Sequence, residues 1–191
     1  HGPIRFLPHS QSCLGRAKTL MTQEPDSMKW IDRMEPESIF WDVGGNIGNL
    51  ALYAARRGVR NIWSFEPAAV NYYNLVANCE LNAFGDQVTC LQLGFGARTE
   101  IARLNVSQLM SGHSFSFGNA EHRRQKRAEK KMEISAQQAV QVWSIDDFIR
   151  HSGAPCPNYL KIDVPGMAKE ILQGATHLLS QETVTQIQIK T

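Results

Sequence analysis

The sequence is poor in cysteine and lacks any long apolar run. Its four cysteines are Cys13, Cys79, Cys90 and Cys156, and no two of them form a C-x-x-C pair. Four cysteines that lie far apart without such a pair argue against a zinc site and against a dense disulfide framework, and we expect reduced, mostly buried thiols. A membrane span needs about 20 consecutive apolar residues, and the longest apolar runs here are only a few residues. We therefore expect a cytoplasmic protein without a membrane span.

The N-terminus shows no charged-then-apolar leader of the kind that directs secretion. The first residue is His1 rather than Met, which leaves open that upstream sequence has been removed.

The sequence also has little net charge, +2, but this charge is unevenly distributed. The stretch EHRRQKRAEKK, residues 121–131, holds six Lys or Arg against two Glu. Such a run can face an anionic substrate, phosphate or nucleic acid, although it is more often a solvated helix or loop. No aromatic residue interleaves it, and aromatic stacking is how single-stranded nucleic acid is usually held. Nucleic acid is therefore not an expected partner.

What the sequence does have is the composition of one globular domain, with 42% hydrophobic and 20% charged residues over 191 positions. This length suits a single domain, 1–191, with a sizeable core. Residues 1–23 show little periodicity, and we expect them to be irregular. Residues 94–146 are too long for one loop and one helix and contain strand-like pieces, which predicts an inserted antiparallel flap that shapes a pocket.

Apolar runs bounded by turn residues predict five strands. These are IFWDV (39–43), NIWSFE (61–66), QVTCLQL (87–93), YLKIDV (159–164) and the weaker TVTQIQI (183–189). Helical patterns separate them, and strands that alternate with helices imply a parallel sheet covered on both faces. The predicted fold class is therefore α/β, with a doubly wound sheet.

The expected helices carry apolar stripes at helical spacing. The first stripe, which Gly58 would end, is Ile47, Leu50, Ala51 and Ala54. The second is Val70, Tyr73, Ala77 and Leu81, after Pro67. The third is Ile171, Leu172, Ala175, Leu178 and Leu179. A short helix is also expected in 24–34, and Asp146 and Asp147 are interpreted as caps of another helix at DDFIRH.

The stretch WDVGGNIG, residues 41–48, places three glycines, which have no side chain, between the first strand and the helix that follows it. In a doubly wound sheet, ligands bind beyond the carboxyl ends of the central strands, and glycines let them approach the backbone closely. We expect Gly44, Gly45 and Gly48 to form such a turn. The exposed N–H groups of the helix that follows favour an oxygen-rich or anionic group.

Two carboxylates flank this turn, Asp42 before the glycines and Glu66 at the end of the second strand. A carboxylate in the second position can accept both hydroxyls of a ribose. However, GGNIG departs from the G-x-G-x-x-G of dinucleotide sites, and Asp42 would repel a pyrophosphate. A cationic nucleoside such as S-adenosylmethionine fits better. A nicotinamide-dependent reductase and a turn without a ligand remain as alternatives.

Five motifs then resemble, in order, those of the FkbM-type methyltransferases, a branch of the class I S-adenosylmethionine-dependent fold. They are FWDVGGNIGNLALYAA, SFEP, NLVANCELN, SIDDF and YLKIDVPGMAKEILQGA, within roughly residues 24–190. The resemblance implies a Rossmann-like sheet, S-adenosylmethionine as methyl donor, and usually O-methylation of a hydroxyl on a sugar, glycan or natural product.

By this resemblance, Asp42, Gly44, Asn46 and Gly48 line the methionine end of the cofactor and Glu66 holds its ribose. The sequence departs from the family on the catalytic side. The pattern K-I-D-V-E-G-A-E becomes KIDVPGMA, so Pro165 and Ala168 replace glutamates, and Gly45 replaces an alanine.

These departures leave open a catalytically degenerate binding module of the same fold. The complete fold also has a sixth and a seventh strand after the fifth. The chain stops at Thr191, so we expect these strands to be missing, as in a fragment.

The predicted catalytic residues are Asp163 and Lys161. Methyl transfer mainly requires that acceptor and donor are held in line, and a base is a supplement. Asp163, at the end of the 159–164 strand, would act as base, and Lys161 on the same face would stabilise oxyanion charge. His113 on the flap is an alternative base, and Trp63 would help to cover the adenine. No metal is expected, and oligomeric state is not predicted.

Overall fold

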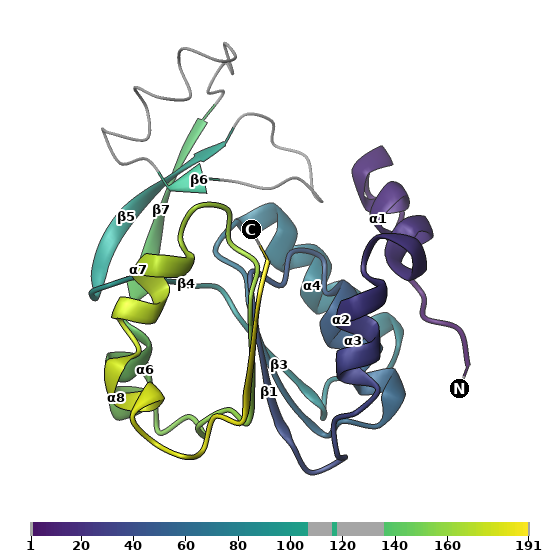
Figure 1. Ribbon diagram of the computed structural model, residues 1–191. Coiled ribbons are helices and arrows are strands. Elements are labelled where there is room, and N and C mark those ends of the chain that lie inside the picture. Colours follow the sequence, from purple (N-terminus) through teal and green to yellow (C-terminus); the bar gives the residue numbers. More distant parts are fainter. Residues whose placement is uncertain (1, 107–115, 118–135, 191) are drawn as a thin grey trace.

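The computed structural model describes residues 2–106, 116–117 and 136–190 (Figure 1). Its main sheet has five parallel strands in the order β3-β2-β1-β8-β9. They are β1 (Ile39–Val43), β2 (Asn61–Phe65), β3 (Val88–Leu91), β8 (Tyr159–Ile162) and β9 (Gln186–Ile189). The strand order reverses between β1 and β8, which places the topological switch point there. The predicted α/β fold with its parallel sheet is confirmed.

Helices cover both faces of this sheet (Figure 1). On one face lie α2 (Pro25–Ile31), α3 (Asn49–Arg57) and α4 (Ala69–Leu81), and on the other lie α6 (Ile145–Ser152), α7 (Ala168–Gln173) and α8 (Thr176–Leu179). Successive side chains of a strand point to opposite faces. Phe40 of β1 accordingly packs in the core under α2–α4, whereas Trp41 and Val43 pack in the core under α6–α8.

Helix α3 follows the prediction closely. Its five buried residues are Leu50, Ala51, Leu52, Ala54 and Ala55. Gly58 ends it in the left-handed conformation, with φ +100°, and its N–H bonds back to the last turn. The helix therefore starts at the glycine turn and leads away from it along the sheet.

The predicted apolar face of α4 is wrong. Tyr73 is 60% exposed and Leu81 is 38% exposed. The helix instead buries three asparagines together with Leu75 and Cys79. Asn78 shows why this is stable, because its amide donates to the Ile47 carbonyl (2.9 Å) and accepts from the Leu7 N–H (2.8 Å). A buried polar group with such partners avoids most of the cost of leaving water.

The helix expected after the fourth strand is two short helices, α7 and α8. Gly174 separates them, and a Cβ at this position would lie 2.1 Å from the Gly96 carbonyl oxygen. Ile171, Ala175 and Leu178 are buried as predicted, whereas Leu179 is half exposed. The break is thus fixed by a close approach between two backbones.

Residues 1–23 are not irregular as expected, because they contain α1 (Gln11–Gln23). The Ser10 hydroxyl caps this helix by accepting from the Cys13 N–H (3.0 Å). Only Cys13 and Leu20 of α1 are buried, and this sparse burial explains the weak periodicity of the sequence.

A second sheet stands at one end of the main sheet, with strand order β4-β7-β5-β6 (Figure 1). It contains β4 (Gly94–Phe95), β5 (Glu100–Val106), β6 (Ser116–Phe117) and β7 (Ala136–Trp143). β5 runs antiparallel to both β6 and β7, which confirms the predicted antiparallel insertion. His113 and the basic run 121–131 lie outside the described residues.

The capping roles of Asp146 and Asp147 differ from the prediction. Ser144 caps α6 by accepting from the Asp147 N–H (3.1 Å). The Asp146 carboxylate instead accepts from the N–H groups of His177 (2.8 Å) and Leu178 (2.9 Å) in α8. Asp146 therefore joins two helices that are close in space.

The described part of the chain holds no helix with the length and apolar character needed to cross a bilayer. Its four cysteines are free thiols.

Candidate active site

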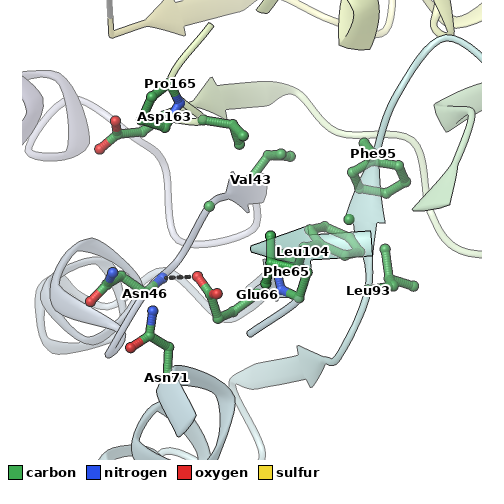
Figure 2. Close-up of a pocket in the computed structure, with 14 residues that line it drawn as sticks. Val43, Asn46, Phe65, Glu66, Asn71, Leu93, Phe95, Leu104, Asp163 and Pro165 are labelled. Atoms are coloured by element: carbon green, nitrogen blue, oxygen red, sulfur yellow. Dashed lines mark hydrogen bonds between the residues drawn. The ribbon is translucent and has the colours of Figure 1, made fainter. Parts of the chain in front are cut away.

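A cavity opens at the carboxyl ends of β1, β2 and β8, next to the switch point (Figure 2). It has about 520 Å³ of empty space, part of it open to solvent. Residues of the glycine turn, of the loop after β2, of the loop after β8 and of the second sheet line it. This is where a doubly wound fold places its ligand.

The cavity has an apolar side and a polar side. Figure 2 shows Leu93, Phe95 and Leu104 on one side and Asn46, Glu66 and Asn71 on the other. The apolar side chains form a wall suited to a planar base. The polar groups offer hydrogen-bond acceptors and donors a short distance away.

The glycine turn is pinned between two neighbouring strands. The N–H groups of Gly44 and Gly45 both donate to the Phe65 carbonyl at the end of β2 (3.0 Å each). Gly44 has φ +82°, and a Cβ there would lie 2.3 Å from the Asp163 carbonyl oxygen. Gly44 therefore has to be glycine for two reasons, its conformation and the closeness of the loop after β8.

Gly45 has a different reason to be glycine. A Cβ at Gly45 would lie 2.1 Å from the Ser64 Oγ, which is buried and has no hydrogen-bond partner among the described residues. Gly45 does not line the cavity. Gly45, where an alanine was expected, therefore leaves room for the Ser64 hydroxyl of β2.

Gly45→Ala is expected to lower the free energy of unfolding by about 1–3 kcal/mol, because the new methyl group displaces the Ser64 hydroxyl. In Gly45→Ala/Ser64→Ala the oxygen is gone, and the cost should largely disappear. Urea unfolding of both variants and of Ser64→Ala measures this coupling. Equal costs for Gly45→Ala with and without Ser64 would contradict the packing explanation.

Glu66 is buried and ties the turn to the start of α4. Its Oε2 accepts from the Asn46 N–H (2.9 Å), and its Oε1 accepts from the Ala68 N–H (2.9 Å). Burial raises the pKa of Glu66 to about 7, although the bonds from Ala68, Asn46 and Asn71 act to lower it. A carboxylate has about four acceptor positions, and these three bonds leave about one for a hydroxyl of a ligand in the cavity. Its contact with a ribose stays a prediction.

Asp42 and Lys161 lie beneath the turn and do not line the cavity. Asp42 is fully buried, and its Oδ1 accepts from the Lys161 Nζ at 2.7 Å. Lys161 is also buried, 3.5 Å from the Gly44 carbonyl oxygen. Burial alone would lower the pKa of Lys161, but the carboxylates of Asp42 and Asp163 outweigh it and raise the pKa.

This ion pair corrects two expectations. Asp42 does not present a free charge to a ligand, because Lys161 already neutralises its carboxylate. Lys161, with only 5% of its side chain exposed, lies below the floor of the cavity rather than beside an acceptor. The sequence reasoning treated the two residues separately, although they are paired across adjacent strands.

Asp163 does line the cavity, where the sequence predicted it. Its side chain is 31% exposed, and its Oδ2 lies 3.7 Å from Lys161 Nζ and 3.9 Å from Lys190 Nζ. The first turn of α7 has no side-chain cap, so Asp163 is not a cap of that helix. Pro165 also lines the cavity, at a position of the expected glutamate.

Several residues of the site were not predicted from the sequence, and Trp63 also lies elsewhere than predicted. Asn71 lies in the first turn of α4, and Leu104 comes from β5 of the second sheet. Their signals were an asparagine that follows the second strand closely and an apolar residue inside the flap. Trp63 does not cover the cavity but packs on Trp41 and Phe148, and Phe65, nearer the strand end, lines the cavity instead.

The parallel sheet, the glycine turn and the cavity at the switch point define a methyltransferase-like fold. The model of the Methyltransferase FkbM domain matches residues 42–191, and the chain belongs to this family. A crystal structure of an FkbM methyltransferase from Methylobacillus flagellatus KT is similar in fold, with a TM-score of 0.54, 16% identity and coverage of 94% of this chain.

Two curated relatives are similar in sequence. The hexuronic acid methyltransferase AglP of Haloferax volcanii is 24% identical over 185 residues, 97% of this chain and 70% of AglP. Methyltransferase 1 of Beauveria bassiana is 29% identical over 147 residues, 72% of this chain and 58% of that protein. The chain spans 44% of the Methylobacillus protein in the crystal structure.

Proposed function

We propose that this protein binds S-adenosylmethionine in the cavity beside the glycine turn and transfers its methyl group to a hydroxyl oxygen of a sugar or glycan. The observation that carries the proposal is the charge of the cavity. The charged side chains that line it are those of Glu66 and Asp163, both acidic, and none of the described residues that line it is basic. Membership of a methyltransferase family supports the reaction type.

The residues present fit this cofactor. The wall of Phe65, Leu93, Phe95 and Leu104 suits an adenine, and the remaining acceptor position of Glu66 beside it suits a ribose hydroxyl. Asp163 complements a cationic group. A nicotinamide dinucleotide fits less well, because both charged side chains that line the cavity are acidic and would repel its pyrophosphate.

When bound, S-adenosylmethionine supplies a methyl group that its sulfonium already activates. The chain then has to orient the reactants and exclude water. Gly44 gives the cavity a lining residue without a side chain, and Glu66 holds the glycine turn against α4. Asp163 is the cavity residue able to accept the hydroxyl proton of an acceptor at a carboxylate oxygen.

A sugar acceptor is proposed because AglP is named for a hexuronic acid.

The departures of this chain from the family pattern motivate a second candidate function. Pro165 gives the cavity no carboxylate at that position. The second candidate is therefore a binding module that holds the cofactor without transferring a methyl group.

Calorimetric titration with S-adenosylmethionine, S-adenosylhomocysteine and NADH tests the first step. We expect binding of the first two at micromolar concentrations and no heat with NADH. Incubation with S-adenosylmethionine and glycosides of glucose and glucuronic acid, followed by mass spectrometry, tests the second. A product heavier by one methyl group supports transfer and removes the second candidate, binding without product supports the binding module, and no binding overturns both.

A further inference from the structure

Two cysteines face each other between α4 and β3. The Sγ of Cys79 on α4 and the Sγ of Cys90 on β3 lie 3.7 Å apart. Both are free thiols. A disulfide needs about 2.05 Å between the sulfurs, so they have to approach by only about 1.7 Å. Cys156 is engaged elsewhere, because its thiol donates to the Gln181 Oε1.

The two thiols are not equivalent. Cys79 is 3% exposed, whereas Cys90 is half-buried. The hydrogen bond between them lowers the pKa of Cys90, against the opposing effects of burial and of the Asp42 charge. The same bond raises the pKa of Cys79. Cys90, the less buried of the two residues, is therefore also the one whose thiol ionises more readily, and a thiol of lowered pKa next to a second thiol is typical of redox-sensitive cysteines.

We propose that Cys79 and Cys90 form an oxidation site at which a peroxide closes an internal disulfide. The Cys90 thiolate attacks one peroxide oxygen, the O–O bond breaks, and Cys90 becomes a sulfenic acid while hydroxide leaves. The Cys79 sulfur then attacks the Cys90 sulfur, and an S–S bond forms as the hydroxyl group leaves with a proton as water. Two thiols are oxidised by two electrons, and one peroxide is reduced.

The crosslink would join the helix next to the cavity to the edge strand of the main sheet. The N-terminal part of α4 carries Asn71, which bonds Glu66, and the Ala68 N–H just before the helix bonds the same carboxylate. β3 is the outermost strand on its side of the sheet. Closing the disulfide therefore fixes the helix that supports Glu66, whatever ligand the cavity takes.

Peptide mapping after hydrogen peroxide treatment tests the proposal. The reduced protein is treated with peroxide, alkylated and digested. We expect Cys79 and Cys90 to lose alkylation together and to appear in one crosslinked peptide lighter by two hydrogen atoms. Cys13 and Cys156 should stay alkylated in the same sample, and Cys156→Ser should leave the crosslink unchanged.

The order of the two steps is tested by trapping sulfenic acid with dimedone. Cys79→Ala should accumulate the dimedone adduct at Cys90, whereas Cys90→Ser should give none at Cys79. Circular dichroism verifies that each variant is folded. If a variant does not fold, the peptide mapping of the unaltered protein still tests whether the disulfide forms. The proposal is overturned if both cysteines remain alkylatable after peroxide, or if the crosslink joins two different molecules.

Discussion

Replacing Lys161 by methionine is expected to lower the free energy of unfolding by about 3–5 kcal/mol, because Asp42 would become a buried charge without a partner. Asp42 is fully buried, and its Oδ2 already has no partner among the described residues. The Lys161 ammonium, 2.7 Å from Oδ1, is thus the group that compensates the carboxylate. Urea unfolding of the variant, followed by circular dichroism, measures the change.

Two further variants separate this explanation from a general packing effect. Lys161→Met/Asp42→Asn removes both charges and should recover much of the loss. Lys190→Met removes a lysine whose side chain is 48% exposed, beside Glu24 and Asp163, and should cost within about 1 kcal/mol. Equal free energies of unfolding for Lys161→Met and Lys190→Met would show that Lys161 does not stabilise the fold by compensating the buried Asp42 charge.

The pH dependence of this pair has a definite sign. The pKa of Lys161 is raised above its usual value of 10.5, so the folded state holds this proton more tightly than the unfolded chain does. The stability from the pair is therefore fully present below about pH 10.5 and is lost as the pH rises through the folded-state pKa. The stability of the unaltered protein should therefore fall as the pH rises above about 10.5, which urea unfolding at several alkaline pH values measures.

The main sheet could be predicted from the sequence because each strand forms a short apolar run between turn residues. β1 and β2 are buried on both faces, so their runs are nearly continuous, and Gly58 gives a clear end to α3. The break between α7 and α8 could not be predicted, because it depends on the approach of Gly174 to Gly96, which are distant in sequence.

The buried face of α4 could not be predicted from hydrophobicity. The helix buries Asn71, Asn74 and Asn78. Asn78 is stable there because the backbone groups of Leu7 and Ile47, in other parts of the chain, bond to its amide. The apolar stripe in the sequence pointed to Tyr73 and Leu81, which remain on the surface. Polar burial of this kind depends on partners that one sequence does not reveal.

The position of the candidate site could be predicted from the sequence, but the contacts of each charged residue could not. The glycine turn, Glu66 and Asp163 follow strands that end at the same edge, so the sequence was enough to place them together. Asp42 also belongs to such a strand. Its side chain, however, points toward α3 and α4 and pairs with Lys161, 119 residues later in the sequence. The free acid predicted from the motif is therefore a neutralised support of the turn.

The protonation of Glu66 should control the binding of S-adenosylhomocysteine, under the proposed function. Ribose hydroxyls donate to an ionised carboxylate, and the pKa of Glu66 is about 7 in the folded protein. Affinity should therefore rise by up to about tenfold per pH unit below pH 7 and level off above it. The sign for folding is opposite, because the folded-state pKa lies above the usual 4.5, so Glu66 reduces stability as the pH rises from 4.5 to about 7.

Glu66→Gln removes the ionisation while keeping the size of the side chain. Its affinity for S-adenosylhomocysteine should be about 10–150-fold lower at pH 8, the value of one hydrogen bond to a charged group, and should not change with pH. Calorimetric titrations at several pH values between 5.5 and 8.5 compare the two proteins. The ligand itself keeps its charge over most of this range, so a pH-dependent affinity of the unaltered protein reports the ionisation of a group in the protein. Equal affinities at pH 8, or parallel pH profiles for both proteins, would mean that Glu66 supports the turn without touching the nucleoside.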